Sequence, residues 1–314
     1  MTPPKIDPTS SLAEAWPALP QSEWSATCAT LQLWMQIVGK VRLALMPPIN
    51  HCWGVTLYPT VRGFTTSPMP YGNHTLQIDF DFVDHLLVIE ASGSNRKTIP
   101  LKPMTVAAFY REFTQVMQSL GTPVPIWPVP VEVADPIPFE RDDTHKDYDP
   151  EYAQRFWRVL LHATRVIETF RARFIGKVSP IHLFWGAMDL ACTRFSGRAA
   201  PEHPSTPGLA DHVTRDAYSH EVSSCGFWPG APGVEAFFYS YAYPEPQRYR
   251  EYSIAPAEAR FDSNFGEFIL PYEAMRNLPD PDAALLEFLQ TTYEAAATCG
   301  KWDRTTLEVT SGQS

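Results

Sequence analysis

Residues 48–54 read Pro-Ile-Asn-His-Cys-Trp-Gly, and residues 180–186 read Pro-Ile-His-Leu-Phe-Trp-Gly, so one pattern occurs twice in the chain. An arginine follows each copy at the same spacing, Arg62 after the first and Arg194 after the second. A Gly-Lys-Val triplet also precedes both copies. This recurrence predicts an internal duplication, in which each copy of the pattern belongs to one of two related units.

The two predicted units share an order of secondary structure. Apolar residues recur at helical spacing in four segments, and alternation of apolar and polar residues indicates strands, most clearly at residues 76–82. The predicted helices lie at residues 22–38, 105–120, 150–174 and 281–298. The predicted strands lie at residues 51–61, 76–82, 86–90, 181–194, 219–227, 235–243 and 268–270.

This order predicts an α+β fold of two pseudo-repeated helix–antiparallel meander–helix units. Residues 1–21 are expected to form an extended N-terminal arm, residues 22–140 the first unit and residues 141–314 the second. Prolines gather at residues 123–138, which places the boundary there because proline cannot donate to a strand ladder. Gly39 is expected to end the first helix, since glycine commonly follows a helix C-terminus.

The composition limits the partners of the chain. Of the 314 residues, 44% are apolar and 19% are charged, which is typical of a folded globular protein. The net charge of −10 argues against a nucleic-acid partner, because phosphate binding needs a basic surface. No segment offers the run of about 18 apolar residues that a membrane span requires. The five cysteines are odd in number and lack CxxC spacing, so we expect free thiols and a cytoplasmic location.

Two repeated arginines are the first candidates for a binding site. Arg62 and Arg194 lie at equivalent positions, at the ends of the strands predicted at residues 51–61 and 181–194. A guanidinium group at a strand end can hold a carboxylate or phosphate through two hydrogen bonds. If the two units face each other, both arginines can converge on one anionic ligand. The alternative is that each arginine pairs with a local carboxylate and fixes the following loop.

Polar residues on two other predicted strands are further candidates for ligand binding. Asp79 and Asp81 share one face of their strand, and His85 lies at the turn beyond it. Paired carboxylates can bind a divalent metal or act as acid and base, but a solvent-facing strand explains them as well. Tyr239 and Tyr241 also share a strand face, where they are expected either to pack in the core or to line a cleft.

One segment, residues 220–230, combines nucleophilic and acid–base side chains. A thiolate nucleophile needs a base within hydrogen-bond reach, which makes His220, Glu221 and Cys225 candidate catalytic residues. The alternative is a buried and inert Cys225, the usual state of a free cysteine. Neither a zinc-type histidine spacing nor a glycine-rich nucleotide loop occurs, so the sequence predicts no metal ligands and leaves the cofactor unknown.

Five strings along the chain are specific enough together to suggest a family. They are RGFTTSP at residues 62–68, FDFVDH at 80–85, TRFSGR at 193–198, HEVSSCGFWPG at 220–230 and YSYAYPEP at 239–246. With them the chain, at 314 residues, resembles an uncharacterised family of bacterial proteins of about 300 residues that is described only as a domain of unknown function. The resemblance implies a cytosolic bacterial protein, and it implies no activity, cofactor or catalytic residue.

The sequence therefore leaves the function unknown and three hypotheses open. The first is a small anionic ligand bound in a groove between the two units, with or without catalysis. The second is a non-catalytic binding or scaffold protein whose polar residues only fix loops. The third is a thiol-dependent enzyme built on Cys225. A small molecule is the partner expected in the first case, neither nucleic acid nor a membrane is expected, and the oligomeric state stays open.

Overall fold

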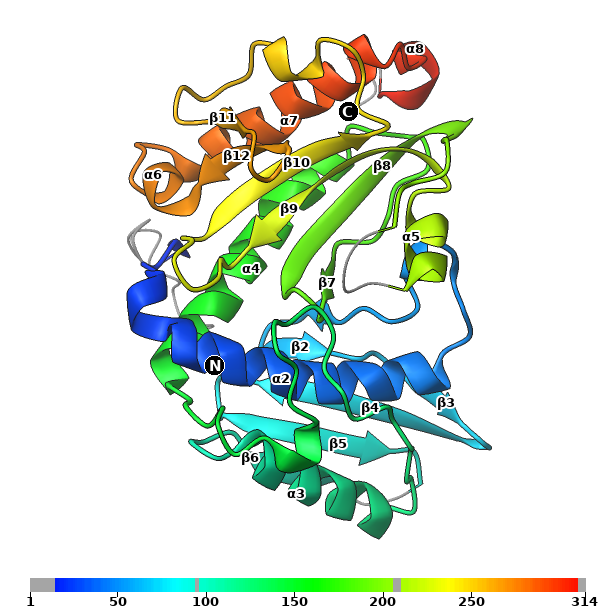
Figure 1. Ribbon diagram of the computed structural model, residues 1–314, viewed down its shortest axis with the longest axis vertical. Helices are drawn as coiled ribbons and strands as arrows, with labels where there is room; N and C mark the ends of the chain where they lie inside the picture. Colours follow the sequence, from blue (N-terminus) through cyan, green and yellow to red (C-terminus); the bar gives the residue numbers. More distant parts are fainter. Residues whose placement is uncertain (1–14, 94–95, 206–209, 310–314) are drawn as a thin grey trace, which may run out of the picture.

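Two antiparallel β-sheets, each covered by helices, make up the protein (Figure 1). The structure is a computed structural model that describes residues 15–93, 96–205 and 210–309. One sheet comes from the first part of the chain and the other from the second part. This arrangement confirms the α+β class predicted from the sequence, whereas the pseudo-repeat stays a prediction.

The first sheet is formed by residues that precede the proline-rich segment. Its strands are β1 (Tyr58–Pro59), β2 (Gly63–Thr65), β3 (Met69–Tyr71), β4 (His74–Asp81), β5 (Leu86–Ala91) and β6 (Lys97–Pro100). Their order is β1-β2-β4-β5-β6, and β3 pairs with the beginning of β4. Strands β4 and β5, which match the strands predicted at residues 76–82 and 86–90, form a hairpin. Ile78 and Phe80 are buried, as their alternation with polar residues predicted.

The second sheet follows in the later part of the chain. Its strands are β7 (His182–Phe184), β8 (Asp189–Ala199), β9 (His220–Trp228), β10 (Phe237–Tyr243), β11 (Arg260–Asp262) and β12 (Glu267–Pro271). Their order across the sheet is β11-β12-β10-β9-β8-β7. The two sheets meet edge to edge, because Leu57 before β1 and Leu183 in β7 exchange backbone hydrogen bonds of 3.0 and 2.8 Å.

Long helices cover these sheets. The α-helices are α2 (Gln21–Leu45), α3 (Val106–Ser119), α4 (Pro150–Arg171), α5 (Asp211–Ala217), α6 (Tyr272–Arg276), α7 (Pro281–Cys299) and α8 (Arg304–Leu307), and the 3-10 helices are η1 (Asn50–Cys52), η2 (Phe139–Arg141) and η3 (Tyr249–Glu251). Side chains of Thr105, Asp149 and Asp280 accept backbone N–H groups at the starts of α3, α4 and α7, as N-cap residues do. None of the helices in the described ranges is long and apolar enough to cross a bilayer.

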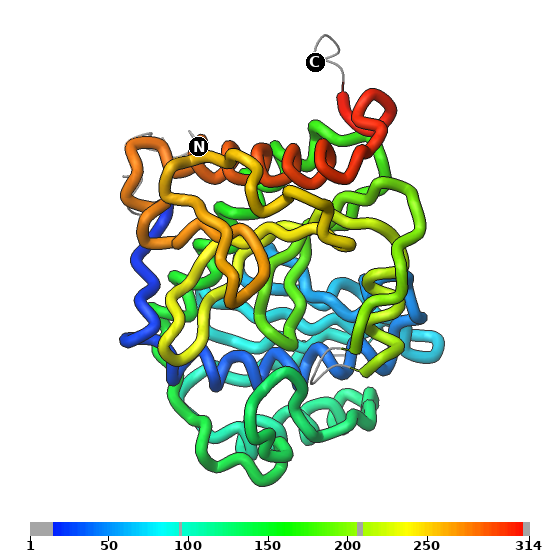
Figure 2. The backbone as a smooth tube through the Cα atoms, turned by 45° about the horizontal axis from the view of Figure 1, so that its top comes forward, coloured from blue at the N-terminus to red at the C-terminus, as the bar shows by residue number. Residues whose placement is uncertain are grey.

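One large hydrophobic core extends through both parts of the chain. Helices α4 and α7 lie together on one face of the second sheet, and α2 runs along the junction of the two sheets (Figures 1 and 2). The core continues across residue 140, where the sequence divided the chain into two units. Of the predicted N-terminal arm, residues 1–14 lie outside the described residues, and Trp16 is fully buried beside Phe238 and Tyr272 of the second part.

Both Trp-Gly pairs of the repeated pattern lie in turns, which corrects two of the predicted strands. His51 and Cys52 adopt left-handed backbone angles within η1, with φ of 57° and 59°, so the strand expected at residues 51–61 is reduced to β1. The strand expected at residues 181–194 is divided by a turn at residues 185–188 into β7 and β8. Two short strands joined by a tight turn show nearly the same pattern of apolar residues as one long strand. Periodicity alone therefore does not distinguish the two arrangements.

Helix α2 continues past Gly39, where the sequence predicted its end. Gly39 lies in the middle of the helix because it makes room for Trp185, whose ring atoms would lie 2.4 Å from a Cβ at this position. The Trp185 side chain is 7% exposed, and its Nε1–H donates to the Val55 carbonyl at 2.7 Å. Glycine thus serves close packing here and not helix termination.

The turn between β7 and β8 is also hydrogen-bonded to α2. Gln32 Nε2 and Gln36 Nε2 both donate to the Gly186 carbonyl, at 2.5 and 3.3 Å. Gln36 reaches the connecting segment as well, donating to the Val131 carbonyl at 2.8 Å and accepting its N–H at 2.9 Å. One helix therefore fixes the connecting segment and the turn that leads into β8.

We predict that Gly39→Ala destabilises the protein by about 1–3 kcal/mol, because the added methyl group overpacks the contact with Trp185. Helix propensity alone acts in the opposite direction, since alanine is favoured over glycine inside a helix by roughly 1 kcal/mol. Ala26→Gly on the exposed face of the same helix is the control and is expected to cost about 1 kcal/mol. Urea unfolding measures both variants, and a Gly39→Ala protein as stable as the parent would contradict this account of α2.

Candidate functional site

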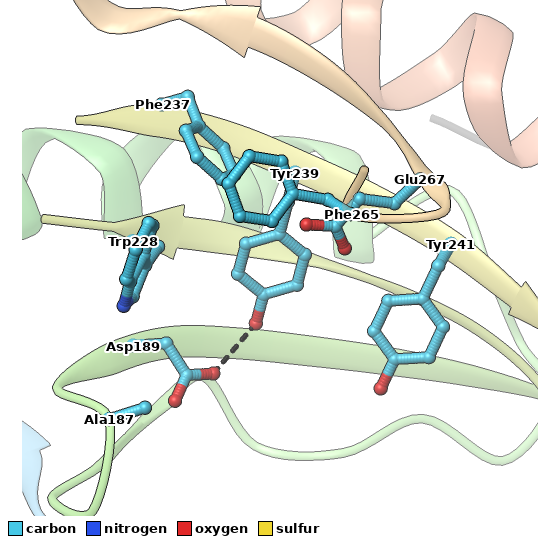
Figure 3. Close-up of a pocket in the computed structure, with 8 residues that line it drawn as sticks. All are labelled: Ala187, Asp189, Trp228, Phe237, Tyr239, Tyr241, Phe265 and Glu267. Carbon is cyan, nitrogen blue, oxygen red and sulfur yellow. Dashed lines mark hydrogen bonds between the residues drawn. The ribbon is translucent and has the colours of Figure 1, made fainter. Parts of the chain in front are cut away.

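An open pocket lies on the second sheet, on the face opposite to the main core (Figure 3). Its volume of about 330 Å³ is at the lower end of the range for small-molecule sites. Residues from the β7–β8 turn, β8, β9, β10 and the β11–β12 hairpin line it: Ala187, Asp189, Trp228, Phe237, Tyr239, Tyr241, Phe265 and Glu267. We call this set of residues the acidic aromatic pocket.

Strand β10 supplies three aromatic side chains because its residues alternate between the two faces of the sheet. Phe237, Tyr239 and Tyr241 line the pocket, whereas Phe238 belongs to the main core. Phe237 and Tyr239 join Ile269 in a small apolar cluster that is separate from the main core. Tyr239 and Tyr241 thus share a face, as the sequence predicted, and their role in ligand binding stays a prediction.

Tyr239 reaches across the neighbouring strand to Asp189. Its hydroxyl donates to Asp189 Oδ2 at 2.8 Å, and it lies 3.3 Å from the Leu190 carbonyl oxygen (Figure 3). Gly226 of β9 lies directly opposite Tyr239 and allows this crossing. A Cβ at Gly226 would lie 2.7 Å from the Tyr239 hydroxyl and 1.7 Å from the Leu190 oxygen. The glycine is therefore a structural requirement of the pocket.

The two carboxyl groups of the pocket hold their protons more tightly than usual. Removal from water raises the pKa of Asp189 to about 6, although the hydrogen bond from Tyr239 acts in the opposite direction. For Glu267, removal from water and the nearby charges of Asp189 and Asp262 raise the pKa to about 8. Carboxyl groups with such values titrate near neutral pH, so the charge of the pocket depends on pH and on any ligand.

Three aromatic rings gather at one end of the pocket. The centroids of Trp228 and Phe237 are 5.3 Å apart, those of Phe237 and Phe265 are 5.1 Å apart, and those of Trp228 and Phe265 are 6.0 Å apart. Phe265 lies in the turn between β11 and β12 and is 44% exposed. The rings of Tyr239 and Tyr241 stack in the other part of the pocket, with centroids 6.2 Å apart.

The chemistry of the lining favours a positively charged group. None of the described residues that line the pocket is Lys, Arg or His, whereas two are acidic and five are aromatic. Carboxylates attract a cation directly, and aromatic faces attract it through their negative π surface. In the described ranges no group of three or more His, Cys, Asp or Glu side chains is placed to hold a metal ion.

A third acid approaches the pocket from behind the β7–β8 turn. Glu132 lies in the connecting segment, and a Cβ at Gly186 would come within 1.9 Å of its Oε1. Removal from water and the charge of Asp189 raise the pKa of Glu132 to about 7. The connecting segment therefore adds to the negative potential at the β8 end of the pocket.

Two candidate residues of the first sheet, Arg62 and Asp81, form an ion pair. Arg62 Nε lies 2.6 Å from Asp81 Oδ2, and Arg62 Nη2 lies 2.6 Å from Asp84 Oδ2. Burial alone would raise the pKa of Asp81, but hydrogen bonds from Arg62 and from the backbone of Asp84 and Val83 hold it below its usual value. These contacts match the alternative in which Arg62 fixes the turn that follows β4.

Asp79 and His85 have separate partners. Asp79 Oδ2 accepts a hydrogen bond from Gln77 Nε2 at 2.8 Å on the same strand. His85 Nδ1 lies 2.9 Å from the Tyr148 hydroxyl, and burial lowers the pKa of this histidine. Neither residue lines the acidic aromatic pocket.

Arg194 lies in surroundings unlike those of Arg62. The Arg194 residue is 1% exposed, and its guanidinium carbon lies 3.4 Å from the ring centroid of Phe170 and 4.3 Å from that of Tyr293. Burial lowers the pKa of Arg194 to about 10. The Arg62 side chain, in contrast, is 46% exposed and ion-paired. The structure therefore gives the two arginines different partners and does not bring them together.

The candidate catalytic residues of β9 have different partners. The His220 ring lies 6.0 Å from the His51 ring, and Glu221 forms an ion pair with Arg198 at 2.6 Å. Cys225 is 3% exposed within the main core, and burial raises the pKa of its thiol well above the ordinary value. All five cysteines are free. The three residues are not assembled into one thiol–base site.

Six residues of the pocket were not among the candidates from the sequence, namely Ala187, Asp189, Trp228, Phe237, Phe265 and Glu267. Trp228 was part of a quoted string and Phe237 lies in a predicted strand, but Asp189, Phe265 and Glu267 are isolated in the chain. Asp189 and Glu267 each begin a strand of mostly apolar residues, and an acid at that place is a weak signal that also fits a solvated strand end. Only the pairing of β8, β9, β10 and β12 brings these acids to one pocket.

Comparison with known proteins gives one match. The model of a protein family with the description "family of unknown function (DUF5996)" matches residues 16–309. This confirms the resemblance to an uncharacterised family that the sequence suggested. No curated protein and no solved structure matches the chain.

We expect iodoacetamide to leave Cys225 unmodified in the native protein near neutral pH, because its thiol is buried and protonated. Cys299, which is partly exposed, is the internal control and is expected to react first. Mass spectrometry of the digested protein identifies the modified residues. Rapid labelling of Cys225 would contradict this result and would favour the thiol-dependent enzyme.

The raised pKa values predict that stability falls as pH rises from about 6.5 to 8.5. In this range the unfolded carboxyl groups are already ionised, whereas the folded Glu267 still binds a proton. Because the folded state binds more protons than the unfolded state, the free energy of unfolding decreases as the pH increases. The buried His182 opposes this change only weakly, because burial lowers its pKa to about 3 and an unfolded histidine, which titrates near 6.5, loses only about half a proton above the lower end of the range.

Urea unfolding at the two ends of this range measures the effect. We expect Glu267→Gln to reduce the loss of stability, because glutamine has no proton to lose. The exposed Glu90→Gln is the control and is expected to keep the loss of the parent protein. If Glu267→Gln shows the same loss as Glu90→Gln, Glu267 does not have a raised pKa.

Proposed function

We propose that the chain, which belongs to the DUF5996 family of unknown function, binds a small organic cation in the acidic aromatic pocket. The observation that carries this proposal is the pair Asp189 and Glu267, two carboxyl groups that line an aromatic pocket with no described basic side chain among its lining residues. A carboxylate that is removed from water is unfavourable unless a positive charge or hydrogen-bond donors compensate it. A bound cation supplies the positive charge, and a cation with N–H groups supplies the donors as well.

The aromatic lining supports the same proposal. A cation close to the face of a tryptophan, tyrosine or phenylalanine gains about 0.5–2 kcal/mol, with the larger values in sites shielded from water. Tyr239 also keeps its hydroxyl bound to Asp189 Oδ2, which holds one carboxyl in position before a ligand arrives. Such preorganisation reduces the cost of ordering on binding.

This proposal keeps the small-molecule hypothesis and changes the sign of the ligand charge. The anionic ligand was inferred from Arg62 and Arg194, which do not line the pocket. The residues that line the pocket belong to the second sheet and its turns, and Glu132 of the connecting segment lies close to Gly186 of the β7–β8 turn. The scaffold hypothesis remains the alternative and predicts that no small molecule binds. A cytoplasmic location also remains a proposal, based on cysteine usage.

Acid–base catalysis on the bound molecule is the second candidate function. Asp189 and Glu267 differ in pKa, at about 6 and about 8, so near neutral pH one carboxyl is mostly ionised and the other mostly protonated. Pairs of carboxyl groups with separated pKa values provide a base and an acid in several enzyme classes. Binding of a cation is the requirement common to both candidates.

Isothermal titration calorimetry with three matched probes tests the proposal: 2-phenylethylamine, 2-phenylethanol and 3-phenylpropanoate. The probes share a phenyl ring and differ in charge. At about pH 8.5 a primary alkylamine remains protonated, while both carboxyl groups are largely ionised. We expect 2-phenylethylamine to bind at least tenfold more tightly than either of the other probes, since a hydrogen bond to a charged group contributes about 1.5–3 kcal/mol.

Variants of the two acids complete the test. The double substitution Asp189→Asn and Glu267→Gln should weaken binding of 2-phenylethylamine by at least about tenfold, whereas Glu90→Gln should leave it unchanged. Circular dichroism confirms that each variant is folded. Equal binding of the alcohol, tighter binding of the carboxylate, or absence of amine binding would each contradict the proposal. Tighter binding of Ca²⁺ than of the amine would replace the organic cation with a metal ion.

A further inference from the structure

We infer that the cation is a primary or secondary amine joined by a short chain to a flat apolar ring, that is, an arylalkylamine. This inference rests on the proposed function and adds the chemical class of the ligand. It is based on the division of the acidic aromatic pocket into two parts of different chemistry. One part is a set of three aromatic rings, and the other is a set of hydrogen-bond acceptors.

The three rings of Trp228, Phe237 and Phe265 form the ring subsite. They come from β9, β10 and the β11–β12 turn, and their centroids lie 5.1–6.0 Å apart. These distances are typical of edge-to-face and offset aromatic contacts, and a ligand ring can extend the same arrangement. Phe265 is 44% exposed, so this apolar surface is open to a ligand. An exposed apolar cluster rimmed by polar groups commonly marks a binding site.

Asp189 and Glu267 form the amine subsite, on either side of Tyr239 in the lining (Figure 3). Asp189 Oδ2 already accepts the Tyr239 hydroxyl, and its second carboxyl oxygen retains acceptor capacity. Within the described ranges no side chain donates a hydrogen bond to the Glu267 carboxyl. A primary or secondary ammonium group carries N–H donors that these acceptors can bind. A quaternary ammonium group has no N–H donor and leaves these acceptors unsatisfied.

The spacing of the two subsites sets the length of the ligand. The antiparallel ladder that pairs Leu190 with Phe227 places Asp189 beside Trp228 of the ring subsite. Neighbouring strands of a sheet lie about 4.8 Å apart. A ring joined to nitrogen through two or three carbon atoms covers this span. The ligand class therefore follows from ring stacking, N–H donation and length together.

Calorimetry with a second set of probes tests the inference. The probes are 2-phenylethylamine, its N,N,N-trimethyl derivative and butylamine, measured on the parent protein under identical conditions. We expect 2-phenylethylamine to bind at least tenfold more tightly than the trimethyl derivative, which lacks N–H donors. It should also bind at least tenfold more tightly than butylamine, which lacks the ring. Equal or tighter binding of either comparison probe would overturn the inference.

Phe265→Ala tests the ring subsite separately. The residue is partly exposed and lies outside the main core, so the variant is expected to fold. It should weaken binding of 2-phenylethylamine by about five- to tenfold and leave butylamine binding unchanged, because aromatic contacts contribute about 0.5–1.5 kcal/mol. Trp127→Ala, which removes a 71% exposed ring outside the pocket, is the control. An equal effect on both amines would overturn the ring subsite.

The outcomes separate this inference from the proposed function. If both amines and the trimethyl derivative bind with similar affinity, and the alcohol and the carboxylate do not, the cation site stands and the arylalkylamine class is wrong. If none of the cationic probes binds, the proposed function fails and the inference fails with it. If only 2-phenylethylamine binds tightly, and the double acid variant loses it, both are supported.

Discussion

The contact between Trp185 and Gly39 is the constraint on which the rest of the structure depends. A Cβ at Gly39 would lie 2.4 Å from the Trp185 ring, so this glycine is what allows the β7–β8 turn to rest on the middle of α2. The same turn is bound through the Gly186 carbonyl to two glutamine side chains of α2. Its next residues, Ala187 and Asp189, form one wall of the pocket. The helix of the first part of the chain therefore positions an acid of the second sheet.

The pocket combines features that favour binding of a ligand but do not contribute to the stability of the fold. Removal from water raises the pKa of both Asp189 and Glu267, and the charges of Asp189 and Asp262 raise the pKa of Glu267 further. No basic side chain of the described lining offsets these charges. Perturbed acids in an aromatic concave site are typical of functional centres. Gly226 is also required for the pocket, because the absence of a side chain there lets Tyr239 cross β9 to Asp189.

The sequence predicted the fold class and most elements because helix caps and alternating strands are local signals. Asp149 caps α4 and β4 alternates as expected, since both depend on neighbouring residues. The end of α2 was wrong because the partner of Gly39 lies 146 positions away, at Trp185. The acids of the pocket were missed for the same reason. The order of the strands places both acids in the pocket, and the sequence around each acid does not indicate that order. Tyr239 was found because its face is set by the period of its own strand.

The central claim is that Asp189 and Glu267 together hold a protonated amine. A crystal structure of the protein soaked with 2-phenylethylamine at about pH 8.5 tests it most directly, because both acids are then largely ionised and the amine is protonated. The account predicts the nitrogen within about 3.2 Å of a carboxylate oxygen of Asp189 or Glu267, with the phenyl ring among Trp228, Phe237 and Phe265. A pocket that remains empty at saturating amine, or an amine bound with its nitrogen turned to solvent, would contradict it.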